Sequence, residues 1–285
     1  MNDQVRDWWR DNPMTYGAEH GRTEYRDGVF ELGTREFLER VDQEFYSWNR
    51  PLHDRRPFDR LFPYDAYGPG SRVLEIGCGL GTMAMNWARN GVDMTAVDLN
   101  PTSISQTRRR FELLGLQGRI EPMDGRRLEL PDGHFDYVYS WGVLHHSSDL
   151  AQSLREMMRV VKPGGGFGLM LYNRRSILHA YKTLYTEGFL HWESRFLEPL
   201  ELASRYGDGA RAEGNPHTWP VTEEELRGML APSSRDLAFR VLGTDLDTCF
   251  HALLPGLGLV LPRWMKKPWA RRWGWSLWAH GHKDS

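Results

Sequence analysis

The chain has 285 residues, with 36 basic and 38 acidic side chains, and its formal net charge at pH 7 is −2. A charge this close to zero provides no overall field that would attract nucleic acid, so proteins that bind DNA or RNA are disfavoured. Only two cysteines occur, the amino terminus has no apolar signal-peptide core, and no apolar run approaches membrane-spanning length, so we expect a cytoplasmic protein without a disulfide framework or stable membrane insertion.

Residues 1–67 form the first predicted segment, and they contain one clear helix. The apolar residues of this helix recur at helical spacing and share one face: Phe37, Leu38, Val41, Phe45 and Trp48. Ahead of it, aromatic side chains are scattered among glycines and charged residues: Trp8, Trp9, Tyr16, His20 and Tyr25. These side chains either cover a binding site or attach the segment to the core, and the sequence leaves both interpretations open.

A strand predicted at 72–76 runs directly into three glycines, Gly77, Gly79 and Gly81, and then into a helix. Glycine has no Cβ, so the backbone of such a turn can adopt left-handed angles and approach a ligand closely. Glu75 comes just before the turn. An acid at this position would repel a pyrophosphate, but it suits a ligand with an ammonium group.

A second acidic residue, Asp98, ends the next apolar run at 92–99. A carboxylate about twenty residues after such a turn can accept hydrogen bonds from both hydroxyls of a ribose. A nicotinamide dinucleotide needs the same acid, but its fingerprint places a third glycine where Thr82 stands. The sequence therefore favours a nucleoside ligand with a cationic group and keeps a nicotinamide-dependent oxidoreductase as an alternative.

Strands and helices alternate through residues 68–173, which predicts a parallel sheet with helices on both faces. A helix is expected to open at Asn100, and its basic run 108–110 is interpreted as a solvated face. Ser147 or Ser148 is expected to cap the next helix.

Residues 174–220 lose this alternation and are rich in aromatic side chains, so we predict a helical cap inserted after the fifth strand, over the substrate. Residues 221–285 are expected to complete the sheet. Thr222 begins a capped helix, and the segments 239–242 and 275–279 are the last two predicted strands.

Basic and indole side chains are interleaved in residues 262–273. This mixture suits a membrane surface or nucleic acid, but Pro262 and Pro268 would break any long amphipathic helix. We therefore predict a solvated connection whose tryptophans pack on the sheet.

Taken together, the motifs of residues 68–173 resemble one family, the class I S-adenosylmethionine-dependent methyltransferases, and within it the branch of ubiquinone and menaquinone biosynthesis. Besides the glycine turn, four segments support the resemblance: 121–125, 130–136, 139–146 and 160–165. It implies a doubly wound, mostly parallel seven-stranded sheet of Rossmann-like type, whose last two strands form an antiparallel edge pair. It also implies an amino-terminal helical lid over the cofactor and leaves room for the helical cap after strand five.

The same resemblance implies S-adenosylmethionine as the cofactor. Glu75 would take its amino group or order the loop, Asp98 would hold the ribose, and Asp124 would meet the adenine. The expected cofactor contacts are Glu75, Gly77, Cys78, Gly79, Gly81, Asp98, Leu99, Asp124, Gly125 and Trp141.

The expected acceptor is a small, partly apolar or aromatic metabolite, because the cap and lid are rich in aromatic side chains. Whether oxygen, nitrogen or carbon is alkylated stays open. A protein that binds the same cofactor but catalyses another sulfonium reaction, such as a cyclisation, is the alternative within this ligand class.

A general base is expected among His145, His146, His20 and Tyr16. His145 is the first candidate, because the carboxyl end of a strand places it where the acceptor should approach and imidazole titrates near neutral pH. The paired histidines could instead only order the turn or touch the cofactor. No metal is expected, since the histidines and cysteines lack the spacing of zinc ligands.

Overall fold

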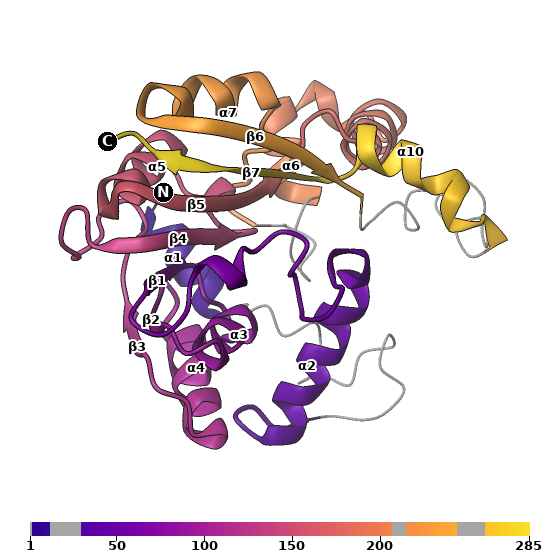
Figure 1. Cartoon of the computed structure of the whole chain (residues 1–285). Coiled ribbons are helices and arrows are strands. Elements are labelled where there is room, and N and C mark those ends of the chain that lie inside the picture. Colours follow the sequence, from indigo (N-terminus) through magenta and orange to yellow (C-terminus); the bar gives the residue numbers. More distant parts are fainter. Residues whose placement is uncertain (1, 12–29, 207–214, 244–259) are drawn as a thin grey trace.

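The computed structural model describes residues 2–11, 30–206, 215–243 and 260–285. They form one seven-stranded sheet with the strand order β3-β2-β1-β4-β5-β7-β6 (Figure 1). The strands are β1 Arg72–Ile76, β2 Asp93–Asp98, β3 Arg119–Pro122, β4 Phe135–Trp141, β5 Val161–Tyr172, β6 Ser234–Leu242 and β7 Ser276–Lys283. The helices are α1 Asn2–Asp11, α2 Arg35–Trp48, α3 Thr82–Arg89, α4 Pro101–Leu114, α5 Leu150–Val160, α6 Pro199–Tyr206, α7 Glu223–Leu230 and α10 Arg263–Trp273.

The first five strands are parallel, and β7 lies antiparallel between β5 and the edge strand β6. This confirms the doubly wound sheet with an antiparallel pair at one edge. The strand order reverses between β1 and β4, where Glu75 lies beside Ala96 on one side and Tyr139 on the other. In open α/β sheets such a reversal opens a crevice at the carboxyl ends of the strands, where ligands bind.

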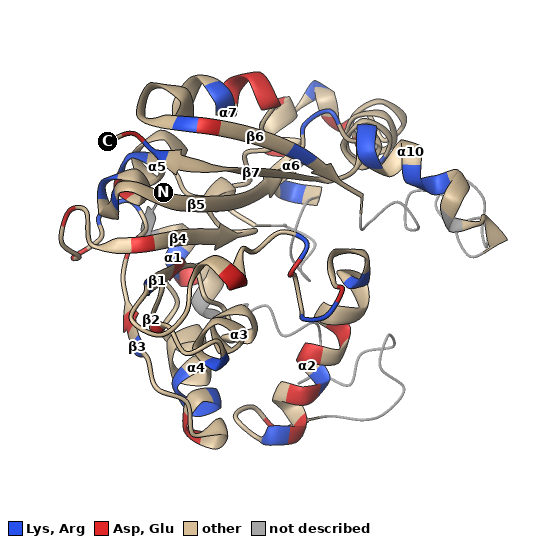
Figure 2. Ribbon diagram, in the orientation of Figure 1, with Lys and Arg blue, Asp and Glu red and all other residues tan. Residues whose placement is uncertain are grey.

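Helix α2 packs through four buried side chains, Phe37, Leu38, Val41 and Phe45, and it also carries acidic and basic residues (Figure 2). Thr34 caps it by accepting a hydrogen bond from the Phe37 amide at 3.2 Å. Trp48 was expected on the buried face, but its side chain is 47% exposed. The helix ends at this residue, so Trp48 lies beyond the last turn that packs on the core.

The prediction that Ser147 or Ser148 caps α5 was wrong. The cap of α5 is Asp149, whose carboxylate accepts a hydrogen bond from the Gln152 amide at 2.9 Å. A short 3-10 turn at Leu144–His146 carries the chain past both serines before the helix begins, and Ser147 bonds to Ser153 instead.

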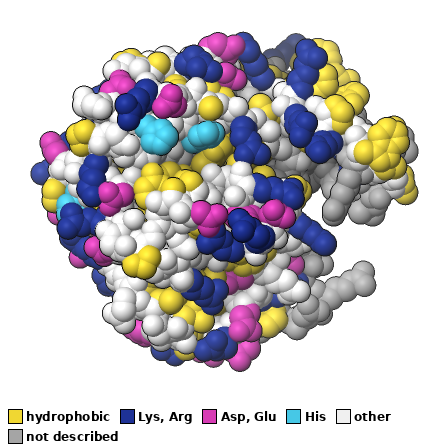
Figure 3. Space-filling model, in the orientation of Figure 1, with side chains coloured by type: hydrophobic (Ala, Val, Ile, Leu, Met, Phe, Trp, Pro, Cys, Tyr) yellow, Lys and Arg dark blue, Asp and Glu magenta, His cyan; other side chains and the backbone are white. Residues whose placement is uncertain are grey.

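The segment after Pro262, where we predicted a solvated connection, is an eleven-residue helix, α10. Pro262 stands at its amino-terminal cap, where the ring fits, and only Pro268 lies inside it. Trp264 and Trp269 are 74% and 47% exposed, so these indoles do not pack on the sheet. Figure 3 shows hydrophobic side chains beside basic ones over this end of the molecule. None of the helices within the described ranges is long and apolar enough to cross a bilayer.

Between β5 and α7 the described residues include three helical segments and a non-helical stretch at 215–222. A π-helix spans His179–Leu190, and a short 3-10 turn at Glu193–Arg195 leads into α6. The capping box predicted at Thr222 is present, with Glu225 closing it.

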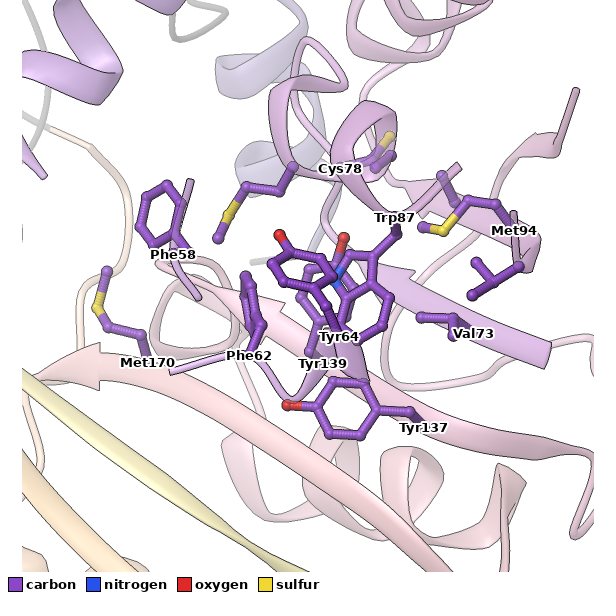
Figure 4. Packing of buried hydrophobic residues seen from close by; sticks show 14 of the residues in the cluster. Phe58, Phe62, Tyr64, Val73, Cys78, Trp87, Met94, Tyr137, Tyr139 and Met170 are labelled. Carbon is purple, nitrogen blue, oxygen red and sulfur yellow. The ribbon is translucent and has the colours of Figure 1, made fainter. Parts of the chain in front are cut away.

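Buried aromatic rings fill one face of the sheet (Figure 4). Trp87 of α3 lies 4.5 Å from Tyr64, and Phe62 lies 4.9 Å from Tyr139, measured between ring centroids. Phe62 and Tyr64 belong to the loop before β1, as does the fully buried Phe58. The part of the amino-terminal segment nearest β1 is therefore hydrophobic core.

Candidate active site

A cavity of about 260 Å³ opens at the carboxyl ends of β1, β2 and β4. Nine of the ten predicted cofactor contacts line it: Glu75, Gly77, Cys78, Gly79, Asp98, Leu99, Asp124, Gly125 and Trp141. Gly81 does not line the cavity, because it begins α3 and faces Thr107. Its volume lies just below the usual range for small-molecule sites, which begins at about 300 Å³.

The glycine turn shapes the floor of this cavity. Gly77 has a φ of 83°, and a Cβ there would lie 2.4 Å from Val143, so no other residue fits. Gly79 has a φ of 52° and nothing within 4 Å of a Cβ position, so its backbone is accessible from the cavity. The amides of Gly77 and Cys78 both donate to the Val97 carbonyl, which fixes the turn against β2.

Asp98 connects the glycine turn to the next helix. One carboxylate oxygen accepts a hydrogen bond from the Gly79 amide at 2.8 Å, and the other accepts one from the Asn100 amide at 2.8 Å. Burial raises the pKa of Asp98, although both amide bonds favour its ionised form. An acid held from two sides in this way keeps a fixed position at the edge of the cavity.

Glu75 is the most buried acid of the site, with 2% of its surface exposed. Its Oε2 atom finds no hydrogen-bond partner within the part of the chain that the structure describes. Burial raises the pKa of Glu75 well above its usual range, and the neighbouring Asp98 raises it further. A buried carboxylate oxygen without a partner is costly, so its retention beside a cavity indicates a ligand that satisfies it.

A buried ion pair attaches α2 to the glycine turn, and the sequence did not predict it. Arg110, expected on a solvated face, is only 1% exposed. Its guanidinium donates to the Leu80 carbonyl at 2.6 Å and to Asp42 of α2 at 2.6 Å. Thr82, the residue that departs from the dinucleotide fingerprint, donates to the same carboxylate at 2.8 Å. Leu80 and Thr82 flank Gly81, so the pair holds the turn and the amino-terminal segment together.

The two adjacent histidines lie in different surroundings. His146 lines the cavity, and its Nδ1 lies 3.0 Å from the His217 carbonyl and 3.2 Å from the Thr218 hydroxyl. His145 does not line the cavity. Its ring packs 3.9 Å from that of Tyr172, neither ring nitrogen has a hydrogen-bond partner among the described residues, and burial lowers its pKa well below the usual range.

Helix α1 contributes to the lining of the cavity. Val5 and Trp9 line it, and the Trp9 ring packs 5.0 Å from that of His146. The Asn100 amide group donates to the Trp9 carbonyl and so connects α1 to the end of β2. The other two candidate bases, Tyr16 and His20, lie outside the described residues.

At the far end of the site, Asp124 lines the cavity but is already engaged, since its carboxylate pairs with Arg126 at 2.8 Å. Trp141 is held edge to face against Phe58, with ring centroids 4.9 Å apart. Phe58 lies outside the motifs, so no sequence signal connected it with the site.

Comparisons with known proteins identify the family. A family model described as a methyltransferase domain matches residues 73–165. A ubiquinone biosynthesis O-methyltransferase of Methylocella silvestris is 34% identical over 177 residues, which cover 58% of this chain and 69% of that protein. This chain belongs to the class I S-adenosylmethionine-dependent methyltransferases. A solved methyltransferase of Methanosarcina mazei shares the fold, with a TM-score of 0.55 and 18% identity over 79% of this chain and 98% of that one.

One relative of this methyltransferase has a different activity in its name. The S-adenosyl-L-methionine-dependent Diels-Alderase iccD of Talaromyces variabilis is 36% identical over 132 residues, which span 45% of each chain. The name of the Diels-Alderase includes S-adenosylmethionine, and the methyltransferase family to which this chain belongs uses the same molecule. S-adenosylmethionine is therefore the cofactor.

The cavity of the methyltransferase fits this cofactor. The partnerless oxygen of Glu75 suits the ammonium of the methionine part, and the open backbone at Gly79 admits a ligand in close contact. Asp98 has further lone pairs for the ribose hydroxyls. The comparisons give no support to the nicotinamide alternative, and Thr82 is accounted for by its bond to Asp42.

Proposed function

We propose that the enzyme transfers the methyl group of S-adenosylmethionine to a hydroxyl oxygen of a small, partly apolar or aromatic metabolite. The observation that supports this most strongly is the composition of the single cavity described above. Its lining includes the acids and glycines that suit the cofactor, and also the apolar and aromatic residues Phe45, Met170 and Tyr172 together with His146. The relatives named as O-methyltransferases favour oxygen as the accepting atom.

The proposed cofactor contacts divide by the part of the molecule that each would hold. Glu75 and the glycine turn, with Cys78, would hold the methionine part, Asp98 and Leu99 the ribose, and Asp124 and Gly125 the adenine, with Trp141 facing the sulfonium. When bound, the cofactor supplies an electrophilic methyl group. The residues around it orient the acceptor behind that group and exclude water, and such positioning contributes about 7–11 kcal/mol to lowering a barrier.

Replacing Glu75 with glutamine should weaken cofactor binding at least tenfold while leaving the cofactor-free protein as stable as the parent, or more stable, at pH 7. Burial holds the pKa of Glu75 in the folded protein well above its ordinary value of 4.5. Between these two values the unfolded chain binds fewer protons than the folded chain, so stability falls by about 1.4 kcal/mol per pH unit as pH rises. Glutamine removes this loss.

Thermal unfolding at several pH values, together with calorimetry of the cofactor, measures both effects. The stability advantage of Glu75→Gln should appear above pH 4.5 and grow with pH. Glu129→Gln, which changes an exposed acid outside the cavity, should alter neither property. Unchanged cofactor affinity in Glu75→Gln would remove Glu75 from the site.

We propose His146, and not His145, as the general base. The His217 carbonyl accepts the Nδ1 proton of His146, which leaves the lone pair of the ring on Nε2. His145 is fully buried and does not line the cavity, so its role would be to pack beneath His146, with ring centroids 4.2 Å apart. The other two candidates, His20 and Tyr16, lie outside the described residues.

Incubation with a panel of phenols, catechols and aliphatic alcohols tests the proposed function. We expect S-adenosylhomocysteine and an O-methylated product from at least one phenolic acceptor. His146→Gln should lower kcat by about 10²- to 10⁴-fold with unchanged cofactor affinity, and His134→Gln, distant from the cavity, should not. Methylation confined to nitrogen or carbon acceptors would contradict the choice of oxygen.

A second candidate function follows from the relative named as a Diels-Alderase. In that case the cofactor would stay intact while the apolar residues of the lining fold a substrate for cyclisation. A polyene substrate isomerised in stoichiometric excess over the cofactor, without S-adenosylhomocysteine, would favour this candidate. Formation of methylthioadenosine would indicate attack on another carbon of the sulfonium.

A further inference from the structure

Large hydrophobic side chains are exposed mainly in two segments of the chain. Fourteen such side chains are exposed among the described residues, and ten of them lie in residues 184–196 or 260–269. They are Leu184, Tyr185, Phe189, Leu190, Trp192, Phe196, Val260, Trp264, Met265 and Trp269. Exposed apolar side chains that cluster in this way mark interaction surfaces in many proteins, so these two segments are candidates for a docking surface.

The second segment is also strongly basic. Residues 248–283 contain six lysines and arginines and no aspartate or glutamate, in a chain whose net charge is −2. Figure 2 shows α10 with basic residues and no acidic ones. Lys267, Arg271 and Arg272 are exposed on it, beside Trp264 and Met265. The apolar groups and the positive charges therefore share one short helix.

Both segments leave the sheet at the edge where the cavity opens. The π-helix follows Tyr172, the last residue of β5, and α10 ends just before Ser276, which pairs with Tyr172. Trp275 lies between them, with its ring centroid 4.4 Å from that of Tyr172 and 6.5 Å from that of His179. Tyr172 itself lines the cavity, so Trp275 connects the start of the π-helix with a residue of the cavity.

We propose that α10 and residues 184–196 dock the enzyme on the surface of an anionic lipid bilayer. Tryptophan favours the boundary between headgroups and acyl chains, and lysine and arginine bind anionic headgroups from the same depth. The eleven-residue α10 is too short to span a bilayer, and its interleaved indoles and cations suit a helix that lies in the interface. An RNA surface would use the cations but would leave Leu184, Leu190 and Met265 in water.

If the enzyme docks through α10 and residues 184–196, its cavity would face the lipid. If the proposed methyl acceptor is apolar, it could then pass from the bilayer into the site along Tyr172 and Trp275. This consequence rests on the proposed function, whereas the docking itself does not, so the two are tested by separate readouts.

Sedimentation of the full-length protein with lipid vesicles tests the docking. We expect binding to vesicles of phosphatidylcholine with phosphatidylglycerol, weaker binding to pure phosphatidylcholine, and loss of the difference at high salt. Lys267→Gln with Arg271→Gln should lower the partition coefficient about thirtyfold, since each cation near an anionic surface contributes about fivefold. Trp264→Ser should lower it about tenfold, the effect of one partly inserted apolar side chain.

Matched controls come from other surfaces of the same chain. Trp48→Ser removes an indole that is also exposed, on α2, and Arg155→Gln removes an exposed cation on α5. Both should change the partition coefficient less than twofold, and all variants should keep the parent melting temperature. The proposal would be overturned if the protein did not bind vesicles, or if it bound neutral and anionic vesicles equally. It would also be overturned if Trp48→Ser and Trp264→Ser had equal effects, or if the protein bound RNA but not vesicles. Methylation of a soluble acceptor without vesicles would be unaffected by any of these results.

Discussion

Replacing Arg110 with methionine should lower the free energy of unfolding by about 3–5 kcal/mol, the cost of breaking a buried ion pair from one side. The variant would leave the Asp42 carboxylate, whose side chain is only 17% exposed, without its guanidinium partner. It would also leave the Leu80 carbonyl without the donor that Arg110 now supplies. Because Leu80 belongs to the glycine turn, cofactor affinity should fall as well.

Urea unfolding measures this loss of stability in the parent, Arg110→Met, Arg109→Met and the double variant Asp42→Asn with Arg110→Met. Arg109→Met changes the neighbouring residue on α4. Its exposed side chain pairs with Glu112 and donates to the Gly33 carbonyl, each at 3.3 Å, so the change should cost less than about 1 kcal/mol. The double variant Asp42→Asn with Arg110→Met should be more stable than Arg110→Met alone, since no unpaired charge remains. Equal stability of Arg109→Met and Arg110→Met would show that the buried pair does not hold α2 on the turn.

Replacing Asp98 with alanine should weaken S-adenosylmethionine binding by about a hundredfold. Hydrogen bonds to a charged group contribute about 1.5–3 kcal/mol, and each 1.4 kcal/mol corresponds to a factor of ten. Asp98 would lose its proposed contact with the ribose, and the Gly79 amide would lose the acceptor that fixes it 2.8 Å away. The loss therefore affects both the ligand contact and the shape of the turn.

Isothermal titration calorimetry measures the cofactor affinity of the parent and of Asp98→Ala. Asp93→Ala, at the exposed opposite end of the same strand, provides the matched control and should bind the cofactor as the parent does. Asp98→Asn should have an intermediate affinity, because the amide oxygen can still accept the Gly79 bond. A parent-like affinity in Asp98→Ala would exclude the ribose contact.

Much of the fold could be predicted because its determinants are local. The strand 72–76 and the capped helix at Thr222 follow from short patterns, and the structure has both. Trp48 and the indoles of α10 could not be placed, since periodicity shows which residues share a face but not where the facing core ends. Pro262 was interpreted as a helix breaker although it stands at the start of a helix, where proline is tolerated.

The residues of the candidate site also include some that the sequence predicts and some that it does not. Glu75 and Asp98 could be predicted because strand ends of a parallel sheet meet at one edge. Arg110 could not, since its partners Asp42 and Leu80 are distant in the sequence and a run of three arginines is typical of a solvated face. The distinction between His145 and His146 depends on the geometry of a 3-10 turn, which no residue pattern reveals.

The central claim is that the glycine turn between Glu75 and Asp98 binds an adenosyl sulfonium amino acid. A crystal structure with S-adenosylhomocysteine tests it most directly. We expect the amino group of the ligand within about 3 Å of Glu75 and its ribose hydroxyls within the same distance of Asp98. An empty turn in crystals soaked at saturating ligand, or a dinucleotide pyrophosphate bound there in its place, would contradict the account.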